Sequence, residues 1–277
     1  MPTAAVNGIE LYYETRGNGP PVLFIQGATG DGGWFDRITG LLADEFTTVT
    51  YDRRGNSRSP APVGWMQTSI EEQAEDAAGL LTVLGLKLVT VFGTSGGGAI
   101  GLELVRRHPG LVAGALLHEP YLPHVLGERW AEVEAQNRAT FEPILRSGGP
   151  RALMEGFLRA MRGEAGYRAL EEELRERVLG NGQAFLLEDA AYPRYRPDDS
   201  AIAAIRSPVF VLVGELPAPW ALPMAAWLAG ERGTEVESVP GGHGGYLDDP
   251  MEFAAALRPY VRQVGSPVAT PGLHVGR

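Results

Sequence analysis

The stretch "LVTVFGTSGGGAIGLEL", residues 88–104, decides the fold, because it places a serine among glycines directly after an apolar run. The residues GTSGG (93–97) match G-x-S-x-G, a strand-to-helix turn that exposes a nucleophilic serine. The overlapping run GGGAIG (96–101) matches G-x-G-x-x-G, which binds a dinucleotide pyrophosphate at a helix start. Glu119 follows roughly 20 residues on, where that second pattern needs an acid for the ribose. The same stretch therefore has two interpretations, a turn with a nucleophilic serine or a dinucleotide-binding loop.

The position of the apolar run favours the serine turn. In a dinucleotide-binding fold, the first glycine of the pattern ends the first strand of its domain. Here the apolar run ends at Gly93, Ser95 follows, and the dinucleotide pattern begins only at Gly96. Several strand-like runs also precede this one, whereas the dinucleotide pattern normally opens its domain. The sequence thus favours a turn from a strand into a helix with Ser95 as nucleophile.

Strand-like and helix-like segments alternate over most of the chain. A hairpin around Asn7-Gly8 opens it, and a helix is expected from Thr68. The expected later strands are residues 21–27, 47–52, 88–93, 111–120, 207–215 and 234–240. Such alternation is typical of βαβ units. It predicts an α/β fold with a mostly parallel central sheet flanked by helices.

One long segment, residues 121–205, lacks strand signals. Its stretches, such as "RALMEGFLRAMR", have the apolar spacing of amphipathic helices and are separated by glycine and proline. We interpret this segment as a helical cap inserted between two strands of the sheet. Residues 1–120 and 206–263 then form the core, and the Pro- and Gly-rich residues 264–277 form a flexible tail.

The composition predicts a soluble cytoplasmic protein that acts on a small molecule. The 277 residues carry a formal net charge of -10, which repels nucleic acids and anionic membranes. The chain has no cysteine, which excludes disulfides, thiolate catalysis and zinc–thiolate sites. It shows no signal peptide, and no run approaches the 18 or so apolar residues of a membrane-spanning helix. Whether the chain forms a homodimer stays open.

A nucleophilic serine needs a base, and the chain has five histidines. His108 ends an expected helix in contact with solvent, His124 lies early in the cap segment, and His274 lies in the tail. His118 is interpreted as a core or supporting residue. His243, in "VPGGHGGYLDDP", follows the last expected strand on a glycine-rich loop that can carry an imidazole over the sheet edge. We therefore expect His243 to be the base.

Over residues 8–263 the chain resembles enzymes of the α/β-hydrolase fold. The motifs that carry the resemblance are "FIQGATG", "YDRRGNSRS", "GTSGG" and "GGHGGYLDDP". In this family the loop of the first motif and the residue after the nucleophile supply the backbone N–H groups of the oxyanion hole. The resemblance implies Gly27 or Ala28 together with Gly96 as these donors. The histidine–glycine pair often found in the first motif is Gln26-Gly27 here, which leaves a backbone donor in place.

A closer resemblance implies which acidic residue completes a catalytic triad with Ser95 and His243. In this fold the acid usually follows the strand "FVLVG", but the corresponding position here is Pro217, which cannot serve. The chain is similar to zearalenone lactonases, which have a serine turn, an acid after the sixth strand, and no aspartate after the seventh. This resemblance implies Glu119 as the acid, with Glu215 as the alternative. Asp52, which lies in a loop motif of the fold, is implied to be structural.

These residues predict hydrolysis of a carboxylic ester or lactone. Ser95 would attack the carbonyl, His243 would transfer the proton, and Glu119 would orient the imidazole. No metal or organic cofactor is expected. Three alternatives on the same residues stay open, namely a cofactor-free perhydrolase, a C–C hydrolase and a tailoring cyclase. A non-catalytic ligand receptor is a further alternative, because plant hormone receptors share the fold.

Apolar side chains between the serine turn and the cap predict an apolar, partly aromatic substrate, although each of them also suits plain core packing. The candidate pocket residues are Trp34, Tyr121, Phe157, Met161, Phe185, Leu187, Tyr192, Trp220 and Tyr246. Zearalenone lactonases carry a cap tryptophan several residues before a Tyr-Pro. This chain has Glu188 at that place before Tyr192-Pro193, which departs from the pattern of that family.

Overall fold

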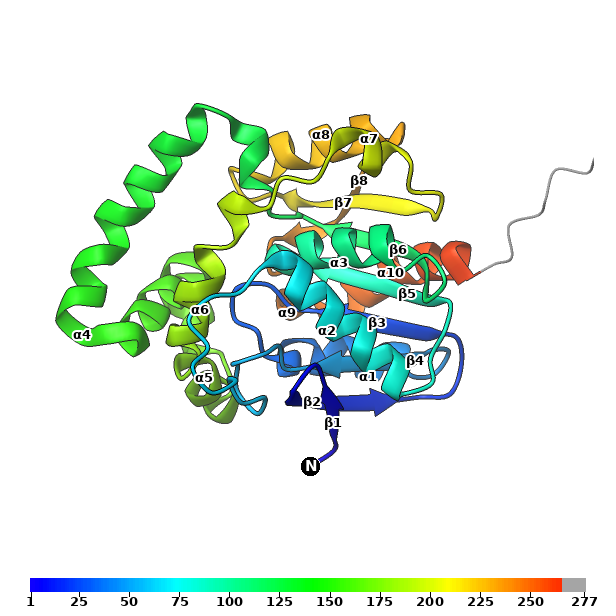
Figure 1. Cartoon of the computed structure of the whole chain (residues 1–277), viewed down its shortest axis with the longest axis horizontal. Helices are drawn as coiled ribbons and strands as arrows, with labels where there is room; N and C mark the ends of the chain where they lie inside the picture. Colours follow the sequence, from blue (N-terminus) through cyan, green and yellow to red (C-terminus); the bar gives the residue numbers. More distant parts are fainter. Residues whose placement is uncertain (266–277) are drawn as a thin grey trace, which may run out of the picture.

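The structure, a computed structural model, describes residues 1–265 and is built on one sheet of eight strands in the order β1-β2-β4-β3-β5-β6-β7-β8 (Figure 1). The strands are Thr3–Val6 (β1), Ile9–Arg16 (β2), Pro21–Ile25 (β3), Thr47–Tyr51 (β4), Val89–Thr94 (β5), Val112–His118 (β6), Val209–Leu216 (β7) and Val236–Gly242 (β8). β2 pairs antiparallel with β1 and β4, and all other neighbours are parallel. The mostly parallel sheet expected from the sequence is confirmed.

Helices cover both faces of this sheet. The helices on one face are α2 (Ile70–Val83), α3 (Gly96–Arg107) and α8 (Ala221–Arg232), and those on the other are α1 (Asp36–Leu42) and α10 (Pro250–Gly265). Successive side chains of a strand point to opposite faces. On β5, Val91 therefore packs in the first apolar core and Phe92 in the second. Burial on both faces explains why the run before the serine is continuously apolar.

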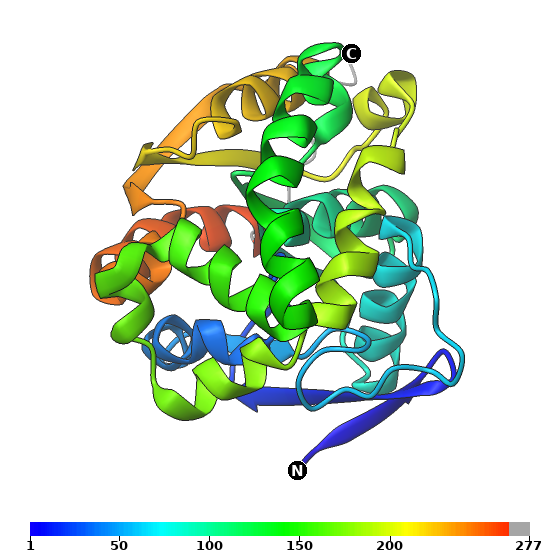
Figure 2. The same cartoon turned by 90° about the vertical axis from the view of Figure 1, so that its left-hand side faces the viewer.

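The segment between β6 and β7 forms the helical cap. Its α-helices are α4 (Arg129–Arg168), α5 (Glu172–Leu179), α6 (Gly182–Asp189) and α7 (Asp199–Ala203). Gly149 and Gly163, with φ of 71° and 65°, interrupt the helical backbone of α4. Figure 2 shows α4 running across the front of the molecule. The division into core 1–120 and 206–263, cap 121–205 and tail 264–277 stays a prediction, and most of that tail lies outside the described residues.

The order of the strands brings two of the predicted site loops together. β3 lies between β4 and β5, so the chain reverses its winding direction at the β3–β5 pair. In open α/β sheets, ligands bind outside the carboxyl ends of the strands at such a reversal. The loop from Gln26 follows β3, and Ser95 follows β5. Among the described residues, none of the helices combines the length and apolar character that crossing a bilayer requires.

Candidate active site

Ser95 lies in the tight turn between β5 and α3. Its φ of 55° and ψ of -125° are unfavourable for a residue with a side chain, so surrounding contacts must hold it there. The Ser95 N–H donates to the His118 carbonyl at 3.0 Å. A Cβ on Gly93 would collide with the Gly97 carbonyl, and a Cβ on Gly97 would collide with the Ile25 carbonyl. Close backbone approach therefore explains the glycines around the serine.

Glu119 and His243 meet beside this turn. His243 Nδ1 lies 2.7 Å from Glu119 Oε2, and the glutamate side chain is fully buried. The Gly214 and Ala218 N–H groups also donate to this carboxylate, at 3.1 Å and 3.3 Å. Burial alone would raise the pKa of Glu119, but the hydrogen bonds to His243 and to the Gly214 N–H lower it overall. The site thus holds a carboxylate against one nitrogen of the imidazole.

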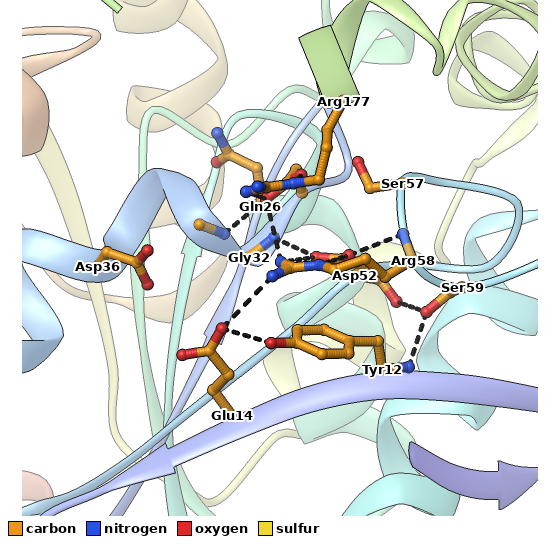
Figure 3. A network of polar contacts seen from close by, with 12 residues as sticks. Tyr12, Glu14, Gln26, Gly32, Asp36, Asp52, Ser57, Arg58, Ser59 and Arg177 are labelled. Atoms are coloured by element: carbon orange, nitrogen blue, oxygen red, sulfur yellow. Dashed lines mark hydrogen bonds and ion pairs between the residues drawn. The ribbon is translucent and has the colours of Figure 1, made fainter. Parts of the chain in front are cut away.

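The alternative acid is placed differently. Glu215 lies near the end of β7 with an exposed side chain, whereas Glu119 is bonded to His243. Asp52, implied to be structural, is fully buried and holds Arg58 through two contacts of 2.6 Å and 2.8 Å (Figure 3). It also accepts the Gly32 N–H at 2.8 Å. These contacts fix the loop after β4.

Ser95 and His243 line one small cavity of about 10 Å³. The other residues that line it are Gln26, Gly27, Ala28, Thr29, Thr94, Met161 and Tyr246. The structure therefore brings together the predicted nucleophile, the predicted base and the loop after β3. A cavity of this size holds about one water molecule. Met161 of α4 closes it from the cap side.

The loop after β3 lies directly against the serine turn, since a Cβ on Gly27 would press on the Ser95 Cβ. The Gly27 N–H donates to Gln26 Oε1 at 3.0 Å. The Gln26 side-chain nitrogen donates to Thr29 Oγ1 at 3.1 Å. The Gly27 donor is therefore already engaged, which leaves Ala28 as the other predicted donor on this loop. The motif "FIQGATG" indicates that this loop supplies a backbone donor, but it does not indicate that the Gln26 side chain binds the Gly27 N–H.

Three of the nine predicted pocket residues line the cavity or pack against His243. Met161 and Tyr246 line the cavity, and the Trp220 ring lies 5.2 Å from the His243 ring. The ring of a fourth residue, Tyr121, packs edge-on against Trp220 at 5.0 Å.

Of the remaining predicted pocket residues, Tyr192 lies against the serine turn, and the other four pack in or against the core or are half-buried. The Tyr192 ring lies 5.4 Å from that of Tyr121, and its hydroxyl lies so close to Gly96 that a Cβ there would collide with it. The Phe157 and Phe185 rings pack 4.7 Å apart. Trp34 is buried in the core on the α1 and α10 face, and Leu187 is half-buried. Trp34, Phe157 and Phe185 therefore pack in or against the core and do not line the cavity.

The other described histidines do not line the cavity. His118 is fully buried, and burial lowers its pKa to about 3, so it is neutral in the folded protein. His108, expected in contact with solvent, is half-buried with Nε2 3.2 Å from Glu75 Oε1. The His124 ring packs edge-on against Trp227. His274 lies outside the described residues.

The sequence pattern of the family described as "alpha/beta hydrolase fold" matches residues 20–250. This chain belongs to that family. The hydrolase is 32% identical over 261 residues to a protein named uncharacterized hydrolase YraK of Bacillus subtilis (strain 168), covering 92% of this chain and 93% of the relative. It is also 26% identical over 265 residues to a zearalenone hydrolase of Bionectria ochroleuca, with 90% and 92% covered.

A solved structure extends these similarities. This hydrolase superposes on a thermophilic esterase from Thermogutta terrifontis with a TM-score of 0.74 and 26% identity. The likeness covers 95% of this chain and 97% of the esterase. The expected resemblance to zearalenone lactonases is confirmed, and together the similarities support a hydrolytic enzyme.

Polar side chains bind the cap of this hydrolase to loops of the core beside the site. Arg177 of α5 lies 2.9 Å from Asp31 (Nε to Oδ2), and Figure 3 shows its side chain reaching down from the cap toward this polar network. Asn181, which precedes α6, donates to the Thr29 carbonyl at 2.7 Å and accepts from the Ser57 N–H at 2.6 Å. These cap contacts reach both the loop after β3 and the loop after β4. The sequence reasoning missed them, because their partners lie far apart along the chain.

Proposed function

We propose that this hydrolase cleaves a carboxylic ester or lactone through an acyl-enzyme on Ser95. The observation that supports the proposal most is the 2.7 Å contact between His243 and Glu119 beside the cavity that Ser95 lines. A buried carboxylate that accepts from Nδ1 leaves Nε2 unprotonated, so this nitrogen can take the serine proton. No other carboxylate of the described chain makes a hydrogen bond or ion pair with His243.

The reaction follows from these positions. The Ser95 oxygen adds to the carbonyl carbon as His243 accepts its proton, and the imidazolium then protonates the leaving alkoxide. Water, activated by the same histidine, releases the acid and restores the serine. The oxyanion would bind the N–H groups of Gly96 and Ala28. Gly96 begins α3, so the positive end of the helix dipole also favours this negative charge.

The substrate class follows from the walls of the site. Trp220, Tyr246 and Met161 surround His243 and the cavity, which favours an apolar acyl or aryl group next to the scissile bond. The relative named zearalenone hydrolase points the same way. Glu188 stands where zearalenone lactonases carry a tryptophan, so we propose an apolar ester or lactone rather than zearalenone itself. A substrate of that size enters only when Met161 is displaced.

A fluorophosphonate probe tests the nucleophile, because only an activated serine reacts readily with phosphorus. Mass spectrometry should find the label on Ser95 of the wild type, and Ser95→Ala should lose both labelling and p-nitrophenyl ester turnover. Ser147→Ala, on the exposed surface of α4, is the matched control and should behave like the wild type. A label on another residue, or an active enzyme without a label, would refute the acyl-enzyme.

A substrate series tests the class. Values of kcat/KM should be higher for octanoate esters and aryl lactones than for acetate esters, because remote apolar contacts help to hold the carbonyl in place. A clear preference for acetate would replace the proposal with a small-ester hydrolase.

A further inference from the structure

The guanidinium of Arg53, a fully buried residue after β4, holds the loop that follows β3. Its Nε donates to the Gln26 carbonyl at 2.8 Å, and its Nη2 donates to the Gly27 carbonyl at 2.5 Å. One rigid, planar group therefore binds two successive peptide carbonyls. A flexible ammonium has no comparable fixed spacing between its donors.

The grip on the two carbonyls fixes the direction of the two N–H groups that follow. In a trans peptide the C=O and the N–H point to opposite sides of the chain, and the described residues contain no cis peptide. When Arg53 binds the Gly27 carbonyl, the Ala28 N–H must point away from Arg53. Gly27 and Ala28 line the cavity with Ser95, whereas Arg53 does not. The guanidinium thus lies behind the loop and turns the Ala28 N–H toward the site.

A carboxylate of the cap holds Arg53 in turn. Glu188 of α6 lies 2.6 Å from Arg53 Nη2 (Oε2), and both side chains are almost completely buried. Its other oxygen accepts from Asn56 Nδ2 at 2.9 Å. Burial alone would lower the pKa of Arg53, but the charge of Glu188 raises it overall, so the guanidinium stays charged. Removing one partner would leave an uncompensated buried charge.

A neighbouring ion pair provides an internal comparison. Arg54 binds Asp76 with two contacts of 2.6 Å and 2.7 Å, and both residues are also buried. This pair joins the loop after β4 to α2, whereas the Arg53–Glu188 pair joins the cap to the two carbonyls beside Ser95. The first pair suits stabilisation of the fold alone. The second pair alone contacts the backbone of the loop beside Ser95.

We propose that Arg53 and Glu188 are positioning residues for the oxyanion hole, through which the cap sets the direction of the Ala28 N–H. This inference rests on the proposed acyl-transfer function. It gives the glutamate that replaces the cap tryptophan of zearalenone lactonases a role in transition-state binding. The side chains act through the loop and do not touch the substrate.

Arg53→Lys tests the positioning role, with Arg54→Lys as the matched control. Lysine keeps the charge that Glu188 needs but cannot reproduce the two-carbonyl grip. We expect kcat to fall about 10- to 100-fold with little change in KM, because the lost contacts serve the transition state. The affinity for an alkylboronic acid, which mimics the tetrahedral adduct, should fall in parallel. Arg54→Lys should stay within about twofold of the wild type, and equal losses in both variants would overturn the proposal.

A double variant separates positioning from folding. Arg53→Met combined with Glu188→Leu replaces the buried pair with apolar side chains of similar size, which is often neutral for stability. We expect a folded protein with the same deficit in kcat as Arg53→Lys. Full activity in this double variant would also overturn the proposal.

Amide hydrogen exchange distinguishes failure of this inference from failure of the proposed function. A wild type without Ser95 labelling and without ester turnover would reject the acyl-transfer function. The exchange rates of the Gly27 and Ala28 amides would still be informative, and we expect them to rise in Arg53→Lys and not in Arg54→Lys. Unchanged exchange in Arg53→Lys would overturn the positioning role whatever the reaction.

Discussion

The carboxyl edge of the sheet and the first half of α4 differ in how their side chains are held. At the edge, Glu119 is buried and bonded to His243 and to two backbone N–H groups. On α4, residues 134–140 are all exposed, and the Arg138–Glu134 pair at 3.0 Å lies within the helix itself. Exposed pairs of this kind contribute about 0.5 kcal/mol or less. The difference teaches that the groups for chemistry are held by buried contacts, whereas the first half of α4 is held weakly.

The second half of α4, which packs on the core through Leu153, Met154 and Leu158, reaches the site at one point. Met161 of α4 lines the cavity although its side chain is 42% exposed, and Arg162 lies 2.7 Å from Asp248 (Nη2 to Oδ1). Gly163, with its positive φ, follows directly. One apolar side chain and one ion pair of the cap therefore lie next to the cavity that Ser95 lines.

The largest expected effect lies at the edge. Glu119→Gln should lower kcat by about 10³- to 10⁴-fold, because the amide no longer favours the reactive tautomer and the charged imidazole. Glu215→Gln, the matched control at the end of the next strand, should stay within about tenfold. Steady-state kinetics on one p-nitrophenyl ester measures both variants. A larger loss of kcat in Glu215→Gln than in Glu119→Gln would assign the role of the acid to Glu215 and contradict the comparison between the sheet edge and α4.

The next effect concerns pH. His118 has a folded pKa of about 3 against an ordinary value of 6.5, so below pH 6.5 the unfolded chain binds a proton that the folded protein excludes. Stability is therefore lost as the pH falls from 6.5 toward 3, by up to about 1.4 kcal/mol per pH unit. Urea unfolding between pH 6.5 and 4 should show a shallower loss for His118→Asn than for the wild type. An equal slope in His118→Asn and the wild type would argue against a neutral His118.

The smallest effect is expected at the cap. Arg162→Ala removes the contact with Asp248, so kcat/KM for bulky esters should rise about two- to fivefold as the open form becomes more populated. Arg138→Ala, on the exposed part of the same helix, should leave kcat/KM unchanged. A fall in kcat/KM for Arg162→Ala would mean that the contact organises the site rather than closing it, and the contrast between edge and cap would weaken.

Local patterns account for most of the fold and for part of the site. The glycines around Ser95 and the apolar run of β5 can be interpreted from the sequence, because they reflect the geometry of one turn and one buried strand. The pair of Arg53 and Glu188 cannot, since neither residue has a neighbour in sequence that signals its partner. The same holds for the Gln26 side chain. It accepts the Gly27 N–H, whereas the motif alone leaves open whether Gly27 or Ala28 is the free donor.

The cavity of about 10 Å³ beside Ser95 has a consequence for every affinity measured on this enzyme. A ligand that binds only the open form shows an apparent dissociation constant equal to the intrinsic constant divided by the open fraction. That fraction belongs to the protein and is common to all its ligands. A substitution that opens the cap would therefore tighten binding of every ligand by one common factor and leave their order unchanged. Selectivity would be read only from ratios between ligands, and never from a single dissociation constant.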